Sequence, residues 1–207
     1  MHEGAHRSTT HRLAETVHLL GAAIWLSGLV MGGVVAAIIF STTPELEPRL
    51  GLFERYEGDH ANLLAGYIQN KVFFAGDVLQ FVGAVLSLGS LVALVAFFKL
   101  PIRRPLGAIR TVSLLSAITL LSYSLLLLSP RMAQNLETFY RHASAGENAQ
   151  ADAAREAFLA DHPTATRTHS AIGALVLVVF LSGAWSVTGR LGVDRPSRAG
   201  GSDGSSA

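Results

Sequence analysis

Four long apolar windows alternate with polar segments along this chain. The windows cover roughly residues 17–40, 72–98, 108–129 and 170–191. A helix needs about 20 residues to cross a hydrocarbon core roughly 30 Å thick, and each window is long enough. Backbone amides cannot remain unpaired in lipid, so the windows are predicted to be helices. We therefore expect an all-α fold, a polytopic membrane protein built as a bundle of four transmembrane helices.

The polar segments predict further helix at one end of this bundle. Asp59 is a good N-cap, and the stretch HANLLAGYIQNK after it predicts a helix that runs into the second window. The stretch RMAQNLETFYRH predicts an extension of the third window. The stretch NAQADAAREAFLADH predicts a short amphipathic helix that ends before Pro163. Together these segments predict a short helical cap outside the membrane.

The chain is expected to form a single membrane domain with short ends. The predicted divisions are an N-terminal segment (1–16), the membrane domain (17–193) with two outer loops (41–71 and 130–169), and a C-terminal tail (194–207). The tail is rich in Gly, Ser and Arg and almost free of apolar residues, so it is predicted to be disordered.

Composition supports a membrane protein and excludes several other classes. Half of the residues are hydrophobic and 15% are charged, whereas soluble domains carry about 25% charged residues. The net charge of +1 gives no general case for binding nucleic acid. The chain has no cysteine, which excludes disulfides, thiolate metal sites and cysteine nucleophiles.

The basic residues predict the orientation in the cell membrane. If the short connection between the second and third windows is cytoplasmic, both termini are cytoplasmic as well. That side then holds nine basic residues against four acids, and the two outer loops hold seven against ten. The nine are Arg7, Arg12, Lys99, Arg103, Arg104, Arg110, Arg190, Arg195 and Arg198.

Asp77 is the one acid inside the windows, with Gln80 about one turn further along the same face. An acid in the membrane is costly, so it should face the bundle and find a partner. The candidate partners are Arg131, Arg167, His169 and the hydroxyl of Tyr123. Asp77 is either a protonatable or cation-binding group on a translocation route, or a structural polar lock between helices.

Other chemistry has less support in the sequence. The outer histidines lack the close spacing of metal ligands, and no two embedded histidines share the depth that bis-histidine haem needs; the outer set is His60, His142, His162 and His169. No HExxH or GxSxG motif and no phosphate-binding glycine loop occurs, so we expect no enzyme, no catalytic residue, no metal site and no cofactor. Small residues recur four apart, as Gly28 with Gly32 and Gly83 with Ser87. They predict close helix packing, or a homo-oligomer through glycine-containing helix faces.

The stretch AGYIQNKVFFAGD contains a G-x-x-Q-x-K-x-F pattern at Gly66, Gln69, Lys71 and Phe73. This pattern resembles a segment of a family of small four-span membrane proteins that includes the eukaryotic transmembrane protein 205. The other matches are a His-Ser pair at His169 and Ser170, and an opening motif formed by His18, Trp25 and Gly28. The stretch HLLGAAIWLSG is also similar to the first helix of copper resistance D-type membrane proteins. The resemblance spans roughly residues 17–190 and implies a four-span fold in a membrane, with no established reaction.

This family pattern adds one geometric expectation. If the second and fourth windows are neighbours, a polar cluster lies under the cap, formed by Gln69, Lys71, Asp77, Gln80, His169 and Ser170. The leading interpretation is a protein embedded in the lipid bilayer that handles or transports a small solute or ion at this cluster. The alternatives are a structural or accessory protein that binds a partner, and a membrane metal or haem protein.

Overall fold

The structure is a computed structural model that describes the backbone of residues 2–191 and the side chains of residues 9–188. Its long helices are α1 (His2–Thr42), α2 (His60–Ala96), α3 (Pro105–Tyr123), α4 (Ser129–Ala145) and α5 (Asn148–Leu191). Two single-turn 3₁₀ helices, η1 (Thr43–Leu46) and η2 (Gly51–Phe53), lie between α1 and α2. One π-helical turn, η3 (Ser124–Leu128), joins α3 and α4 into one continuous rod.

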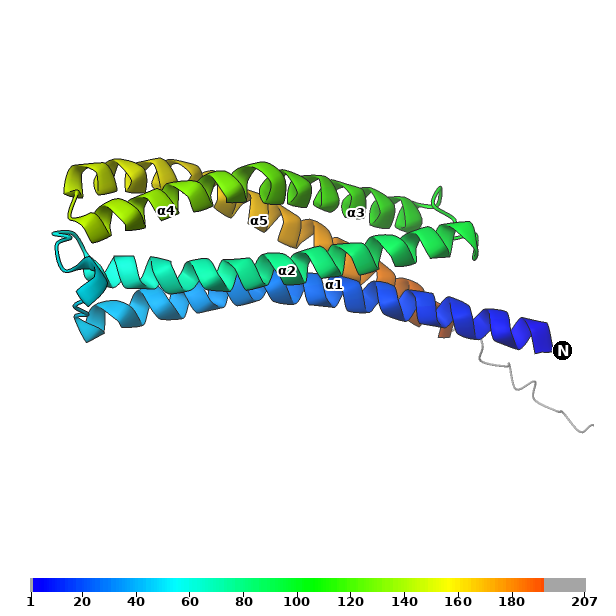
Figure 1. The fold of residues 1–207 in the computed structure, drawn as a ribbon. Coiled ribbons are helices and arrows are strands. Elements are labelled where there is room, and N and C mark those ends of the chain that lie inside the picture. The colour runs from blue at the N-terminus through cyan, green and yellow to red at the C-terminus, as the bar shows by residue number, and fades with distance from the viewer. Residues whose placement is uncertain (1, 192–207) are drawn as a thin grey trace, which may run out of the picture.

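Within the described residues, four helical rods are long and apolar enough to cross a membrane: α1, α2, the joined α3–α4 rod, and α5. This confirms the predicted all-α, membrane-spanning four-helix bundle. Figure 1 shows α1 and α2 lying side by side, while α5 leaves α4 at one end and crosses toward α1 at the other. The first helix begins, and the last described helix ends, at the same end of the bundle.

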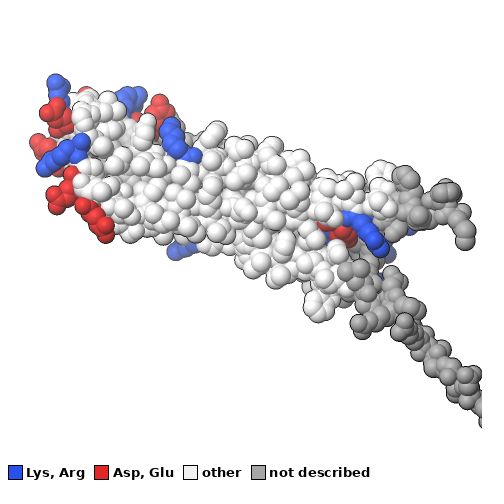
Figure 2. Space-filling view, turned by 90° about the horizontal axis from the view of Figure 1, so that it is seen from below, with Lys and Arg blue, Asp and Glu red and all other residues white. Residues whose placement is uncertain are grey.

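Charged side chains are concentrated at the ends of the bundle. On the face drawn in Figure 2, they crowd the end that carries the η1–η2 segment, and a smaller group lies near the opposite end. The surface between the two groups is almost entirely uncharged. This belt is the part of the surface that suits a lipid environment.

The tightest helix contact joins α1 to α2 through glycines. A methyl group added to Gly83 would lie 2.6 Å from the carbonyl oxygen of Gly21, and one added to Gly28 would lie 2.8 Å from the carbonyl oxygen of Gly76. The absence of these side chains lets the two backbones approach closely. Gly28 and Gly83 therefore have the close packing role that their spacing predicted.

The predicted cap forms a second, smaller core at one end of the bundle. The Asp59 carboxylate accepts hydrogen bonds from the backbone N–H groups of Ala61 and Asn62, so α2 begins where its N-cap predicted. The buried residues of this core are Phe53, Tyr56, Leu63, Leu136, Phe139, Ala143 and Ala151. Burial, together with the carboxylate of Asp152, raises the pKa of Tyr56, which keeps its hydroxyl protonated as a donor.

The expectation of a short helix ending before Pro163 is wrong. α5 runs without interruption from Asn148 to Leu191 with Pro163 inside it. A proline inside a helix removes one hydrogen bond, to the carbonyl four residues earlier. Here that carbonyl belongs to Leu159, which is exposed, and α5 is held on both sides of the proline by packing against α4 and α3. Trp185 is 72% exposed on the surface of α5.

The predicted N-terminal segment 1–16 is helical from His2 onward and continuous with the first span. The outer loops 41–71 and 130–169 are mostly helical as well, because α2, α4 and α5 extend through them. The predicted disordered tail, residues 194–207, lies outside the described residues.

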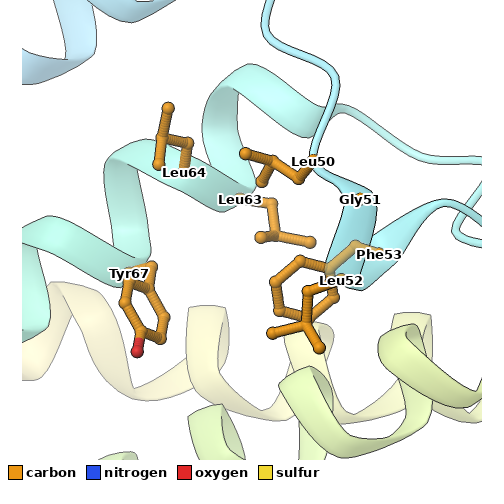
Figure 3. A pocket seen from close by; sticks show the side chains of 7 residues that line it. All are labelled: Leu50, Gly51, Leu52, Phe53, Leu63, Leu64 and Tyr67. Atoms are coloured by element: carbon orange, nitrogen blue, oxygen red, sulfur yellow. The ribbon is translucent and has the colours of Figure 1, made fainter.

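A surface pocket of about 320 Å³ lies at the cap end (Figure 3). It is formed by the η2 turn and the first turns of α2, and its lining residues are Leu50, Gly51, Leu52, Phe53, Leu63, Leu64 and Tyr67. None of these side chains carries a charge, so the polar chemistry of the molecule lies elsewhere.

Candidate functional site

A buried hydrogen-bonded network occupies the end of the bundle opposite the cap. We call it the Arg110 network, and its members are Glu15, His18, Ser87, Ser90 and Arg110. Arg110 Nη2 donates to Glu15 Oε2 over 2.8 Å, and Arg110 Nε donates to His18 Nε2 over 3.0 Å. His18 Nδ1 lies 3.0 Å from the carbonyl oxygen of Ser87. The network thus ties α3 to α1 and α1 to α2.

The network is closed to solvent. Glu15, His18 and Arg110 are 3%, 0% and 1% exposed. The Nε–H of Arg110 can only donate, so His18 Nε2 must accept and the single ring proton lies on Nδ1. Nδ1–H then donates to the carbonyl oxygen of Ser87. The geometry therefore holds a neutral histidine beside a charged Arg–Glu pair.

The fourth span reaches the same point through a glycine. A methyl group added to Gly183 of α5 would lie 3.7 Å from Arg110 Cζ and 3.7 Å from His18 Cδ2. The bare backbone of Gly183 therefore lets α5 pack directly against the guanidinium and the imidazole. All four spans meet at the Arg110 network.

Several polar atoms of the network still lack a hydrogen-bond partner. They are Glu15 Oε1, Arg110 Nη1 and Ser87 Oγ, and each is fully enclosed. A buried polar atom without a partner costs roughly 1–3 kcal/mol, more when it is charged. Proteins usually keep such atoms where water, an ion or a changing partner meets them. Glu15 Oε1 can therefore accept one further hydrogen bond, and Arg110 Nη1 can donate one further hydrogen bond.

A second polar group lies nearer the cap, and we call it the Asp77 cluster. His169 Nε2 of α5 lies 4.0 Å from Asp77 Oδ1 of α2, and Gln80 Nε2 donates to the same oxygen over 3.2 Å. His169 Nδ1–H donates to the carbonyl oxygen of Ala165, which leaves Nε2 free to face the carboxylate. Among the partners that the sequence offered for Asp77, the structure selects His169.

The remaining residues of the predicted six-residue cluster lie elsewhere. Gln69 is buried against α1, where its Nε2 donates to the carbonyl oxygen of Gly32 over 2.9 Å. Lys71 is exposed, with its Nζ 5.6 Å from the centre of the Tyr67 ring, and Ser170 is exposed on α5. Eight residues separate Gln69 from Asp77, which rotates their side chains by about 80° around a helix with 3.6 residues per turn. One therefore faces α1 while the other faces α5.

The two groups form two polar layers of the bundle at different depths. On α2, Asp77 and Ser87 are 10 residues apart, and on α5 His169 and Gly183 are 14 residues apart. On the third rod, Arg110 and Ser124 are also 14 residues apart. These spacings correspond to about 15–21 Å at 1.5 Å per residue. Both layers therefore fit within a hydrocarbon core roughly 30 Å thick, one toward each edge.

Ser124 is buried at the start of the π-helical turn, and its hydroxyl is enclosed without a partner. π turns inside α-helices are often found at functional positions. The count along the rod places Ser124 at about the depth of the Asp77 cluster. The third rod thus brings a polar group to each of the two layers.

The Arg110 network was missed from the sequence because its charges lie close to the basic end. Arg110 was counted among the residues that set orientation, yet it lies six residues beyond Arg104, about 9 Å into the helix. The signal that could have found the network is on α1. Glu15, His18 and Trp25 fall on one helical face at spacings of three and seven.

Candidate metal ligands are not clustered around the histidines of the described residues. No group of three or more His, Cys, Asp or Glu side chains with metal-binding geometry occurs within that part of the chain. Comparison with known protein families, with curated proteins and with solved structures found no match.

Proposed function

We propose that this chain is a multi-pass protein of the cell membrane that moves a small ion across the bilayer. The Arg110 network carries the proposal, because an acid, a base and a cation are enclosed where all four spans meet. Charged groups inside membrane bundles commonly mark ion routes. The Asp77 cluster supplies a second acid and a second histidine nearer the other edge.

The rival function is a structural or accessory protein in which the same network only locks the helices. A buried ion pair is weak evidence for such a role, because apolar side chains of similar volume often stabilise a fold as well or better. Glu15 Oε1 and Arg110 Nη1 have no hydrogen-bond partner, which also favours a site that exchanges an ion over a purely structural contact between helices.

The orientation and the family are parts of the same proposal. We place both termini in the cytoplasm, because basic residues outnumber acidic ones in the terminal segments and in the connection between the second and third spans. The resemblance to the four-span family of transmembrane protein 205 supports a membrane location. Two of its motif residues, His18 and Trp25, lie fully buried in the bundle.

Flux through purified protein in liposomes tests this function. We expect the wild-type chain to carry at least one of H⁺, Na⁺, K⁺ and Cl⁻ faster than protein-free liposomes, measured with ion-sensitive dyes sealed inside. Asp77→Asn removes a charge but keeps an oxygen for Gln80, so it should reduce that flux by about tenfold, since one charged stop is lost from a low-dielectric route.

The matched control is Glu156→Gln, which neutralises an exposed acid of the cap. Its flux should equal that of wild type. Wild-type liposomes that carry none of the four ions, or an Asp77→Asn variant that carries them at the wild-type rate, would contradict the proposed function.

A further inference from the structure

The two polar layers are connected by a line of enclosed polar atoms along the α1–α2 contact. Gln80 Oε1, Trp25 Nε1 and Ser87 Oγ each lack a hydrogen-bond partner in the bundle interior. Gln80 and Trp25 are 2% and 0% exposed. No other membrane-embedded part of the described chain shows three such atoms in succession between two titratable groups.

The order of these atoms follows from the packing of the glycines. A methyl group on Gly28 would lie 3.4 Å from Gln80 Cγ, and one on Gly83 would lie 2.7 Å from Trp25 Cβ. A methyl group on Gly21 would lie 2.7 Å from Ser87 Oγ. Along the α1–α2 contact, starting from the Asp77 cluster, the side chains therefore follow in the order Gln80, Trp25, Ser87 and His18. The last of these, His18, donates a hydrogen bond to the Ser87 carbonyl oxygen.

The α2 positions that carry or contact these three side chains are spaced at short, similar intervals. Gln80, Gly83 and Ser87 are three and four residues apart, which corresponds to steps of about 5 Å along the helix. Two hydrogen bonds that share one water molecule span a similar distance. Because enclosed polar atoms of this kind are usually satisfied by water, the line suits single bridging waters.

The chemistry of the line selects among small ions. A metal cation needs several oxygens around it at each stop, as in rings of carbonyl groups. Here the stops are single atoms, and Trp25 Nε1 and Arg110 Nη1 can only donate, which disfavours a cation. An anion would meet the carboxylates of Asp77 and Glu15. A proton can move along bridging water molecules, because each water both accepts and donates, and the enclosed donor and acceptor atoms of this line would hold such waters in place.

We propose that the ion is a proton, and that it crosses between the Asp77 cluster and the Arg110 network past Gln80, Trp25 and Ser87. This inference rests on the proposed function and names its substrate. The titratable and charged groups that face the route are His169 from α5 beside Asp77, and Arg110 from α3 beside Glu15 and His18. α2 faces the network with the uncharged Ser87 and Ser90, and α5 with Gly183.

Protons are conserved in one transit. At one edge an O–H bond forms on the Asp77 carboxylate as a proton arrives, and it breaks as the proton passes inward. At the other edge the proton binds Glu15 Oε1, which has no partner, and then leaves to the opposite side. No group is oxidised or reduced, and each residue returns to its starting state.

The experiment uses the full-length chain in liposomes that contain a pH-sensitive dye, with proton movement driven by a potassium gradient and valinomycin. Trp25→Phe and Gln80→Leu nearly keep side-chain volume but remove the polar atom. We expect each to slow proton flux by about tenfold, because the loss of one hydrogen-bonded stop raises the barrier within the interior. Trp185→Phe is the matched control, since Trp185 is 72% exposed on the lipid-facing surface. It should leave the rate unchanged.

The thermal unfolding midpoint of each variant is measured alongside its flux. The flux of a variant is interpreted only when this midpoint equals that of wild type. Wild-type flux of Na⁺, K⁺ or Cl⁻ without protons overturns the proton inference and leaves the proposed function standing. Proton flux that neither substitution slows overturns the route. Liposomes that carry none of the four ions overturn both the inference and the function on which it rests.

Discussion

Replacing Arg110 with methionine is expected to lower the free energy of unfolding by about 3–5 kcal/mol, because it leaves one member of a buried ion pair without its partner. Glu15 then keeps a carboxylate that is 3% exposed, and His18 loses the donor at Nε2. Reversible unfolding in mixed detergent micelles measures the change. Arg104→Met is the matched control, since Arg104 is exposed six residues earlier, and its effect should be within about 0.5 kcal/mol.

Removing the whole ionic group should have a different result from removing one member. In the triple variant Glu15→Leu, His18→Leu, Arg110→Met, the network becomes apolar and no charge is left enclosed. The free energy of unfolding is expected to return to the wild-type value or exceed it by about 1–4 kcal/mol. A single Arg110→Met variant as stable as wild type would mean that the pair is not enclosed as described.

Gly83→Ala is expected to destabilise the bundle by about 1–3 kcal/mol, through overpacking at the closest approach of α1 and α2. The new methyl group would lie 2.6 Å from the carbonyl oxygen of Gly21 and 2.7 Å from the backbone nitrogen of Trp25. Both neighbours are backbone atoms, so the helices must separate to relieve the contact. The same unfolding titration measures the effect.

Gly89→Ala supplies the comparison on the same helix. A methyl group there meets nothing within 4 Å. Alanine is favoured over glycine inside a helix by roughly 0.5–1 kcal/mol, so this variant should be as stable as wild type or slightly more stable. Equal effects of Gly83→Ala and Gly89→Ala would show that α1 and α2 do not pack through these glycines.

The fold could be predicted from the sequence because its main signals are local. The length and apolarity of each window require a helix in lipid, and the Asp59 cap and the outer extensions follow from short patterns. Pro163 was misread because its local penalty is one lost hydrogen bond. A helix 44 residues long, packed on both sides of the proline, tolerates that loss.

The candidate site could be predicted only in part because it depends on which helices face one another. Asp77 could be identified because it is an acid in an apolar window, but His169 was only one of several candidate partners for it. Gln69 was grouped with it by depth, whereas helical rotation turns it toward α1. Arg110 looked like an interfacial charge until the structure showed α1 and α5 closing over it.

The ion flux of the triple variant Glu15→Leu, His18→Leu, Arg110→Met tests the central claim most directly. The variant is first shown to be at least as stable as wild type, so that a change in flux cannot be attributed to unfolding. If the Arg110 network is the exchange site for the ion, the variant should be folded and carry no ion above the rate of protein-free liposomes. Flux at the wild-type rate would contradict the account and identify the network as a lock between helices.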